Sequence, residues 1–175
     1  MPRVSRAAAA RHREEAIVAA SRLFLEHGVA GVSLQTVSQE VGLTHGFFYK
    51  QFASKSELVE SAVARAFSDL LEQIAVSPVP EVLELCIAAG QRPNSSADCP
   101  ITAFAANAYH AQADPTLRQA FAAGLARVLE STGAEDRFLV TLAACVGAAV
   151  IARAAGGEAF AAQIVAAVRA EPWNR

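Results

Sequence analysis

The chain has 175 residues, of which 53% are hydrophobic and 18% charged, and its net charge is −2. That length and composition allow a substantial core and argue against a disordered chain, while the small negative charge argues against a protein that coats nucleic acid through charge alone. Alanine dominates and strand patterns are scarce, so we expect an all-α protein with about nine helices.

The N-terminus is locally basic although the whole chain is not. Four arginines, Arg3, Arg6, Arg11 and Arg13, precede the first acidic residue, Glu14. This charge pattern predicts either a basic arm that meets an acidic partner or a solvated tail, and the sequence leaves both open. An amphipathic helix is expected over residues 5–27, and a glycine at position 28 is expected to end it.

Residues 33–57, SLQTVSQEVGLTHGFFYKQFASKSE, form the most informative stretch and are called the helix-turn-helix unit below. Ser33 is a predicted N-cap, Gly42 a turn, and Thr44 the N-cap of a second short helix. Ser54 and Glu57 have the S-x-x-E spacing of a capping box at the start of a further helix. A helix, a glycine turn and a second helix are the arrangement of DNA-binding helix-turn-helix motifs.

The second short helix of this unit, which follows Thr44, is expected to have one side that faces the core and other sides that are accessible. Phe48 and Phe52 lie four residues apart, so both should point into the core. The other faces then carry polar and aromatic side chains that a nucleic acid could meet, namely His45, Phe47, Tyr49 and Lys50.

From Ile17 to Leu58 the chain resembles the N-terminal domain of the TetR/AcrR family of transcriptional regulators. The resemblance rests on AA at 19–20, LF at 23–24, Gly28, Ser33, VGLT at 41–44, GFFY at 46–49, Phe52 and SKSEL at 54–58. It implies a DNA-binding domain over residues 1–55, with the basic arm, and a helical ligand-binding and dimerisation domain over residues 56–175.

The resemblance also assigns roles to residues of the helix-turn-helix unit. Hydroxyl and amine groups would bind DNA phosphates, which place the protein on the duplex without reading its sequence. These are Ser33, Thr36, Thr44, Tyr49 and Lys55. Base contacts would come from Gln35, His45, Gly46 and Phe47. The family often has a small residue in place of Phe47, whose ring could contact a thymine methyl group or fold back onto the core.

Helices are expected to fill the rest of the chain. One runs to about Val76 and is ended by Pro78 and Pro80. Another covers residues 81–89, and a polar loop follows at 91–98. Further helices are expected to begin near Pro100, with Asp98 as a cap, and near Pro115, with Asp114 before it.

The middle helices place polar residues among apolar ones, as a ligand cavity requires. The predicted pocket for a small-molecule inducer is lined by Ile87, Phe104, Asn107, Tyr109, His110 and Phe121. The alternative is an ordinary core in which Asn107 and His110 are hydrogen-bonded or exposed.

Two terminal helices, over residues 135–154 and 158–170, are rich in small and apolar side chains. They resemble the family's dimerisation pair, which joins its twin in a four-helix bundle, although packing within one chain would also explain them. The predicted interface comprises Ala144, Gly147, Ala148, Ile151, Phe160, Ile164 and Val168. The apolar run from Phe138 to Ala152 has 15 residues, fewer than the roughly 18–20 of a membrane span, so a buried helix is expected.

The sequence therefore predicts a homodimeric regulator that binds a palindromic double-stranded DNA operator and is released by a small-molecule inducer. Three cysteines without metal-like spacing indicate a reducing cytoplasm, and no cofactor or membrane partner is expected. The alternative is a thiol-based redox or electrophile sensor built on Cys99. An enzyme using Cys99 and His110 is not expected, because eleven helical residues separate them by roughly 16 Å.

Overall fold

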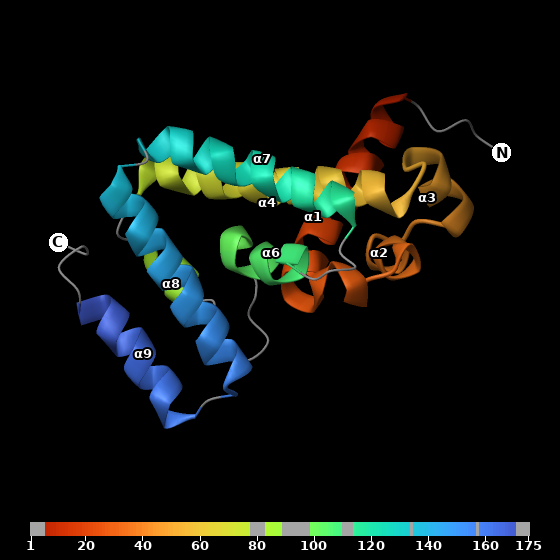
Figure 1. The fold of residues 1–175 in the computed structure, drawn as a ribbon. Helices are drawn as coiled ribbons and strands as arrows, with labels where there is room; N and C mark the ends of the chain where they lie inside the picture. The colour runs from red at the N-terminus through yellow and green to blue at the C-terminus, as the bar shows by residue number, and fades with distance from the viewer. Residues whose placement is uncertain are drawn as a thin grey trace.

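The computed structural model describes residues 6–77, 83–88, 99–109, 114–133, 135–156 and 158–170, without the side chains of His45 and Phe47. All regular structure in these ranges is helical (Figure 1). The helices are α1 (Arg6–Gly31), α2 (Leu34–Glu40), α3 (His45–Gln51), α4 (Lys55–Val76), α6 (Pro100–Tyr109), α7 (Pro115–Thr132), α8 (Asp136–Ala154) and α9 (Ala159–Ala170). Residues 83–88 are also helical, so the predicted all-α class is confirmed.

Several predicted helix ends are confirmed because each depends on a local cap or turn. Helix α1 breaks at Gly28, whose φ of 74° favours glycine. Helix α4 ends at Val76, and α6 begins at Pro100. The predictions at Pro78, Pro80, Asp98 and loop 91–98 lie outside the described residues.

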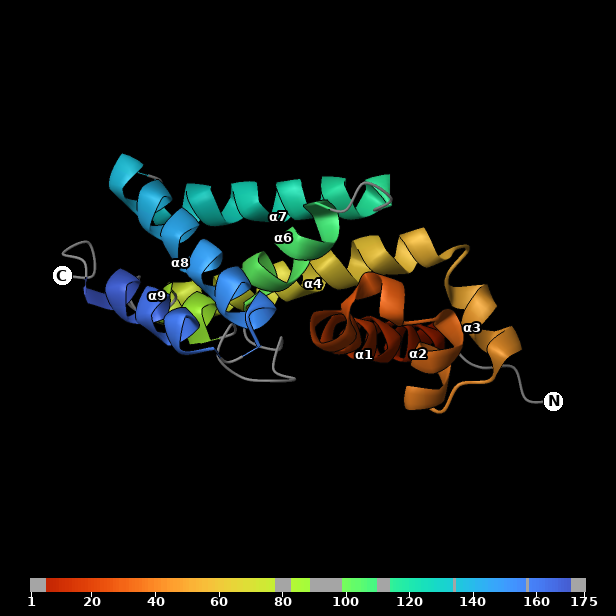
Figure 2. The same ribbon diagram turned by 60° about the horizontal axis from the view of Figure 1, so that its bottom comes forward.

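Helix α4 is the central element of the fold. It begins beside the helix-turn-helix unit, and α7 runs alongside it in the same direction, while α1 crosses its first half (Figures 1 and 2). The side chains of Phe67 on α4 and Phe121 on α7 meet edge to face with ring centroids 5.9 Å apart. At Gly124 of α7 a Cβ atom would lie 2.3 Å from the Phe67 ring, so a side chain there would force the two helices apart.

The two ends of the molecule have different architectures. Helices α2 and α3 lie at one end, and the antiparallel pair α8 and α9 lies at the other (Figure 1). Helices α4 and α7 extend between these two ends (Figure 1).

Candidate nucleic-acid interface

Local hydrogen bonds set the geometry of the helix-turn-helix unit. The Ser33 hydroxyl accepts the Thr36 N–H at 3.0 Å, which confirms Ser33 as the N-cap of α2. Gly42 turns the chain with a φ of 66°, and the Leu43 N–H then donates to the Ser38 carbonyl at 2.9 Å. This closed turn fixes the angle at which α3 leaves α2.

Helix α3 is held by two phenylalanines on one face. Phe48 and Phe52 are fully buried, with ring centroids 5.1 Å apart, as the sequence predicts. Tyr49 lies on another face and is 49% exposed. The core side and the accessible side of α3 are therefore distinct.

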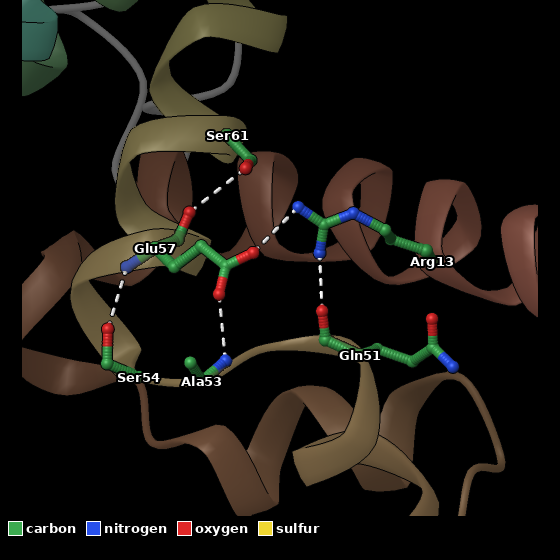
Figure 3. A network of polar contacts seen from close by, with 6 residues as sticks. All are labelled: Arg13, Gln51, Ala53, Ser54, Glu57 and Ser61. Carbon is green, nitrogen blue, oxygen red and sulfur yellow. Dashed lines mark hydrogen bonds and ion pairs between the residues drawn. The ribbon is translucent and has the colours of Figure 1, made fainter.

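Arg13 clamps the segment that follows α3 against α1 (Figure 3). Its guanidinium donates to the Gln51 carbonyl at 2.6 Å and to the Glu57 carboxylate at 2.9 Å, and it lies 4.4 Å from the centroid of the Phe52 ring. Arg13 is therefore part of the scaffold, and its predicted place in a free basic arm is wrong. Arg6 and Arg11 lie in α1, whereas Arg3 is outside the described residues.

Of the two hydrogen bonds that make up a capping box, one is present at the start of α4 as predicted, and the other is made to a different residue. The Ser54 hydroxyl accepts the Glu57 N–H at 3.1 Å, as expected. The Glu57 carboxylate binds the N–H of Ala53 at 2.8 Å (Figure 3). This partner lies one residue before the N-cap residue that a capping box usually binds, and the other Glu57 oxygen accepts Arg13 from α1.

Most predicted DNA-contact residues with described side chains are exposed on the surface of α2 and α3. They are Ser33, Gln35, Thr36, Thr44, Gly46 and Tyr49. Thr44 occupies the N-cap position of α3 but its side chain makes no capping hydrogen bond. The side chains of His45 and Phe47 lie outside the described part of the chain, so the predictions for them stay predictions.

Lys55 differs from the other predicted phosphate contacts. Its ammonium group donates to the Val29 carbonyl at 2.8 Å, which joins the start of α4 to the end of α1. Partial burial lowers the pKa of Lys55, and the nearby Asp114 carboxylate opposes this shift. Lys55 thus has a scaffold role that the sequence did not indicate.

The backbone of Val29 is also bound from α6, through its N–H group. The Asn107 side-chain oxygen accepts the Val29 N–H at 3.3 Å, and its amide nitrogen donates to the Ala103 carbonyl at 2.8 Å. At Gly28 a Cβ atom would lie 2.8 Å from that oxygen. The positive φ therefore requires glycine, and a side chain at this position would also displace the Asn107 oxygen from the Val29 N–H. These bonds fit the hydrogen-bonded alternative for Asn107 rather than a pocket-lining role.

We expect Asn107→Leu to lower the free energy of unfolding by about 1–3 kcal/mol, because the largely buried Val29 N–H would lose its acceptor. Chemical denaturation followed by circular dichroism measures this change. Asn107→Asp is the matched control, because it keeps an oxygen that can accept the Val29 N–H. Equal stability of Asn107→Leu and the parent chain would show that this bond does not hold α6 to α1.

A second connection joins α4 to α7. The Ser56 hydroxyl donates to the Asp114 carboxylate at 2.6 Å, and the other carboxylate oxygen caps α7 by accepting the Thr116 N–H at 2.9 Å. The hydrogen bond from Ser56 is the main reason that the pKa of Asp114 lies below its usual value. The sequence predicts Asp114 as a cap but gives no sign of its partner on α4.

The other residues predicted to line the pocket lie in different environments. Ile87 and Phe104 are buried in the core, and Phe121 is half-buried against Phe67. Tyr109 is 91% exposed in the single chain, and its place in a pocket stays a prediction. His110 lies outside the described residues.

Helix α8 carries apolar side chains on its surface as well as on its inner face. By length and composition alone it could cross a membrane, a test that core helices of soluble proteins also pass. Its bounds agree with the helix predicted over residues 135–154, but only part of it is buried. Among the residues predicted at a dimer interface, Ala148 is buried in its own chain, whereas Ile151 and Phe160 are exposed. Leu139, Val140 and Val150 are further exposed apolar residues of α8, and the interface stays a prediction.

Comparison with known proteins identifies relatives of both the helix-turn-helix unit and the whole fold. Residues 16–62 match the family model described as bacterial regulatory proteins, tetR family. Reduced E. coli NemR superposes with a TM-score of 0.66 at 17% identity, over 91% of this chain and 95% of its own. A TetR transcriptional regulator from Chloroflexus aurantiacus gives 0.65 at 22% identity, over 91% and 93% of the two chains.

The multidrug binding protein EbrR, solved in complex with ethidium, is similar over 90% of this chain and 96% of its own. Its TM-score is 0.60 and its sequence identity is 20%. A search of curated protein sequences finds no match.

Proposed function

The chain has the fold of a TetR-family transcriptional regulator, and on this premise we propose that it binds a palindromic DNA operator as a homodimer and represses transcription. The single observation that carries the proposal is the helix-turn-helix unit, in which Phe48 and Phe52 bury one side of α3 while Tyr49 stays accessible. The DNA-binding domain comprises residues 1–55 and the regulatory domain residues 56–175, with the boundary at the first turn of α4.

Within this proposal the exposed hydroxyls of α2 and α3 bind phosphates and set the register of the protein on the duplex. Gln35 and the first turn of α3, with His45, Gly46 and Phe47, lie in the major groove and contact bases. The net charge of −2 means that affinity depends on these placed contacts rather than on a broad basic surface.

A small-molecule inducer would act on the regulatory domain, as the ethidium complex of the similar multidrug binding protein suggests. Such a molecule favours release only if it binds the DNA-free conformation more tightly than the DNA-bound one. The Asn107 link to Val29 and the Asp114 link to Ser56 provide polar routes from α6 and α7 to the helix-turn-helix unit. We place the protein in the cytoplasm, where its DNA partner is.

Selection of bound sequences from a pool of random double-stranded DNA tests the central proposal. We expect an enriched palindrome with two equal half-sites, because a two-fold dimer presents two copies of α3. Recovery of sequences without a shared motif, or with a single half-site, would contradict specific binding by a dimer.

With that operator in hand, Tyr49→Phe should weaken binding by about tenfold or more, since a hydrogen bond to a charged group contributes about 1.5–3 kcal/mol. The loss should be the same on variant operators, because a phosphate contact carries no sequence information. Fluorescence anisotropy at fixed salt concentration measures the affinities. Unchanged operator affinity would show that the Tyr49 hydroxyl does not bind DNA.

A further inference from the structure

All three cysteines of the sequence lie in the core near the start of α6, although they are far apart in the chain. Cys86, Cys99 and Cys145 are free thiols and are fully buried. Cys86 belongs to the helical residues 83–88, Cys99 directly precedes α6, and Cys145 lies on α8. The sequence showed no second cysteine close to Cys99, but the fold supplies one.

Backbone contacts place Cys86 beside the first turn of α6 independently of the thiols. The Thr102 hydroxyl donates to the Cys86 carbonyl at 3.3 Å. Cys99 is three residues before Thr102, and its carbonyl accepts the Ala103 N–H at 3.0 Å, as the residue at a helix start does. The Cys86 and Cys99 thiols lie close enough to affect each other's ionisation, so the geometry brings the two side chains together at the start of α6.

The two thiols of this pair have unequal tendencies to ionise. Burial alone would raise the pKa of Cys99, but hydrogen bonds from Cys86 and from the N–H groups of Thr102 and Ile101 bring it below its usual value. The hydrogen bond to Cys99, followed by burial, raises the pKa of Cys86. Cys99 also stands at the N-terminus of α6, where the positive end of the helix favours a thiolate, so we assign Cys99 as the nucleophile of the pair and Cys86 as its partner.

We propose that Cys86 and Cys99 form a redox-active dithiol, which a small neutral peroxide converts into a disulfide within one chain. Burial selects the oxidant, because hydrogen peroxide is small and uncharged whereas a bulky aromatic disulfide reagent cannot reach the pair in the folded protein. Cys145 lies on α8, and burial raises the pKa of its thiol to about 11, so we assign the pair to Cys86 and Cys99.

The chemistry balances with peroxide as the sole oxidant. The Cys99 thiolate attacks one peroxide oxygen, so that an S–O bond forms, the O–O bond breaks and the leaving hydroxide takes up a proton to become water. The Cys86 sulfur then attacks the sulfenic acid, the S–S bond forms, and the S–O bond breaks with loss of a second water. Two thiols have supplied the two electrons that reduce peroxide to two waters.

The disulfide would change the structure at the start of α6. In the reduced chain the Cys99 side chain lies at the N-terminus of α6, a position that suits a thiolate better than a disulfide sulfur. Helix α6 also carries Asn107, which holds the Val29 peptide group at the end of α1. Oxidation would therefore alter a helix that is bonded to the DNA-binding domain.

The test treats the reduced, folded full-length chain with hydrogen peroxide, then unfolds it, alkylates the remaining thiols and maps the peptides by mass spectrometry. We expect a linked Cys86–Cys99 peptide and an alkylated Cys145. The unfolded chain, treated in the same way, establishes that the peroxide dose suffices to oxidise accessible thiols. A link to Cys145, a link between chains, or three alkylated cysteines in the folded sample would overturn the proposal.

Variants separate the roles of the two sulfurs. Cys145→Ala should form the linked peptide as the parent does, and it is a matched control because Cys145 is equally buried. Cys86→Ala should stop at a Cys99 sulfenic acid, which a cyclic 1,3-diketone traps, whereas Cys99→Ser should give neither product. Circular dichroism checks that each variant is folded, and Cys86→Ser replaces Cys86→Ala if the latter is not.

Absence of trapped sulfenic acid in a folded Cys86 variant would refute Cys99 as nucleophile. These readouts need no DNA, so their failure is distinct from failure of the proposed DNA binding.

Discussion

Phe48→Ala is expected to lower the free energy of unfolding by about 3–5 kcal/mol, the usual cost of removing a buried aromatic ring. The ring is fully buried and lies against Phe52, whose other neighbour is the guanidinium of Arg13. Its loss would leave a cavity under α3 and loosen the helix that carries the proposed base contacts. Chemical denaturation followed by circular dichroism measures the change.

Tyr49→Ala is the matched control, since it removes the adjacent aromatic ring from the same helix. Its side chain is half exposed, so we expect a loss of no more than about 1 kcal/mol, close to that of other surface substitutions. Operator affinity should then separate the two variants: Tyr49→Ala should bind poorly while folded, whereas Phe48→Ala should bind poorly because it is partly unfolded. The opposite order of stabilities would mean that α3 presents its other face to the core.

The features of the fold that could be predicted from sequence are those determined by local chemistry. The N-cap at Ser33, the glycine turn at Gly42 and the paired phenylalanines each depend on residues within one turn or loop. The positions of prolines were also enough to predict the end of α4 and the start of α6. For these elements, local preference and the final fold agree.

Contacts between distant segments could not be predicted in the same way. In the sequence Arg13 is one of four arginines near the N-terminus. Its hydrogen-bond partners, Gln51 and Glu57, are 38 and 44 positions away. The proximity of Cys86 and Cys99 likewise depends on how residues 83–88 pack beside α6. Sequence spacing alone does not specify which surfaces of two helices meet.

The predicted interface on α8 shows the limit of helical periodicity. When a helix is apolar on several faces, its sequence pattern does not show which face points to the core. For this reason Ala148 and Ile151 were both assigned to one surface. In the structure Ala148 is buried within its own chain, whereas Ile151 is 44% exposed. Only the packing of α8 against α6 and α9 separates its inner and outer faces.

Ile151→Glu is expected to convert the proposed dimer into a monomer. The exposed apolar side chains of α8 and α9, from Val140 to Phe160, form a surface that a second copy would cover in a four-helix bundle. A carboxylate at the centre of that surface would be buried without a partner, which costs far more than the apolar contact it replaces. Light scattering coupled to size-exclusion chromatography measures the mass in solution.

Operator affinity should fall with the loss of the dimer, by about 10²- to 10⁴-fold, because a monomer no longer gains the second half-site as an intramolecular event. Val18→Glu is the matched control, since Val18 on α1 is also 44% exposed but lies outside the proposed interface. It should remain a dimer. A dimeric Ile151→Glu chain would place the interface elsewhere, and a monomeric chain with full operator affinity would show that one helix-turn-helix unit is sufficient for binding.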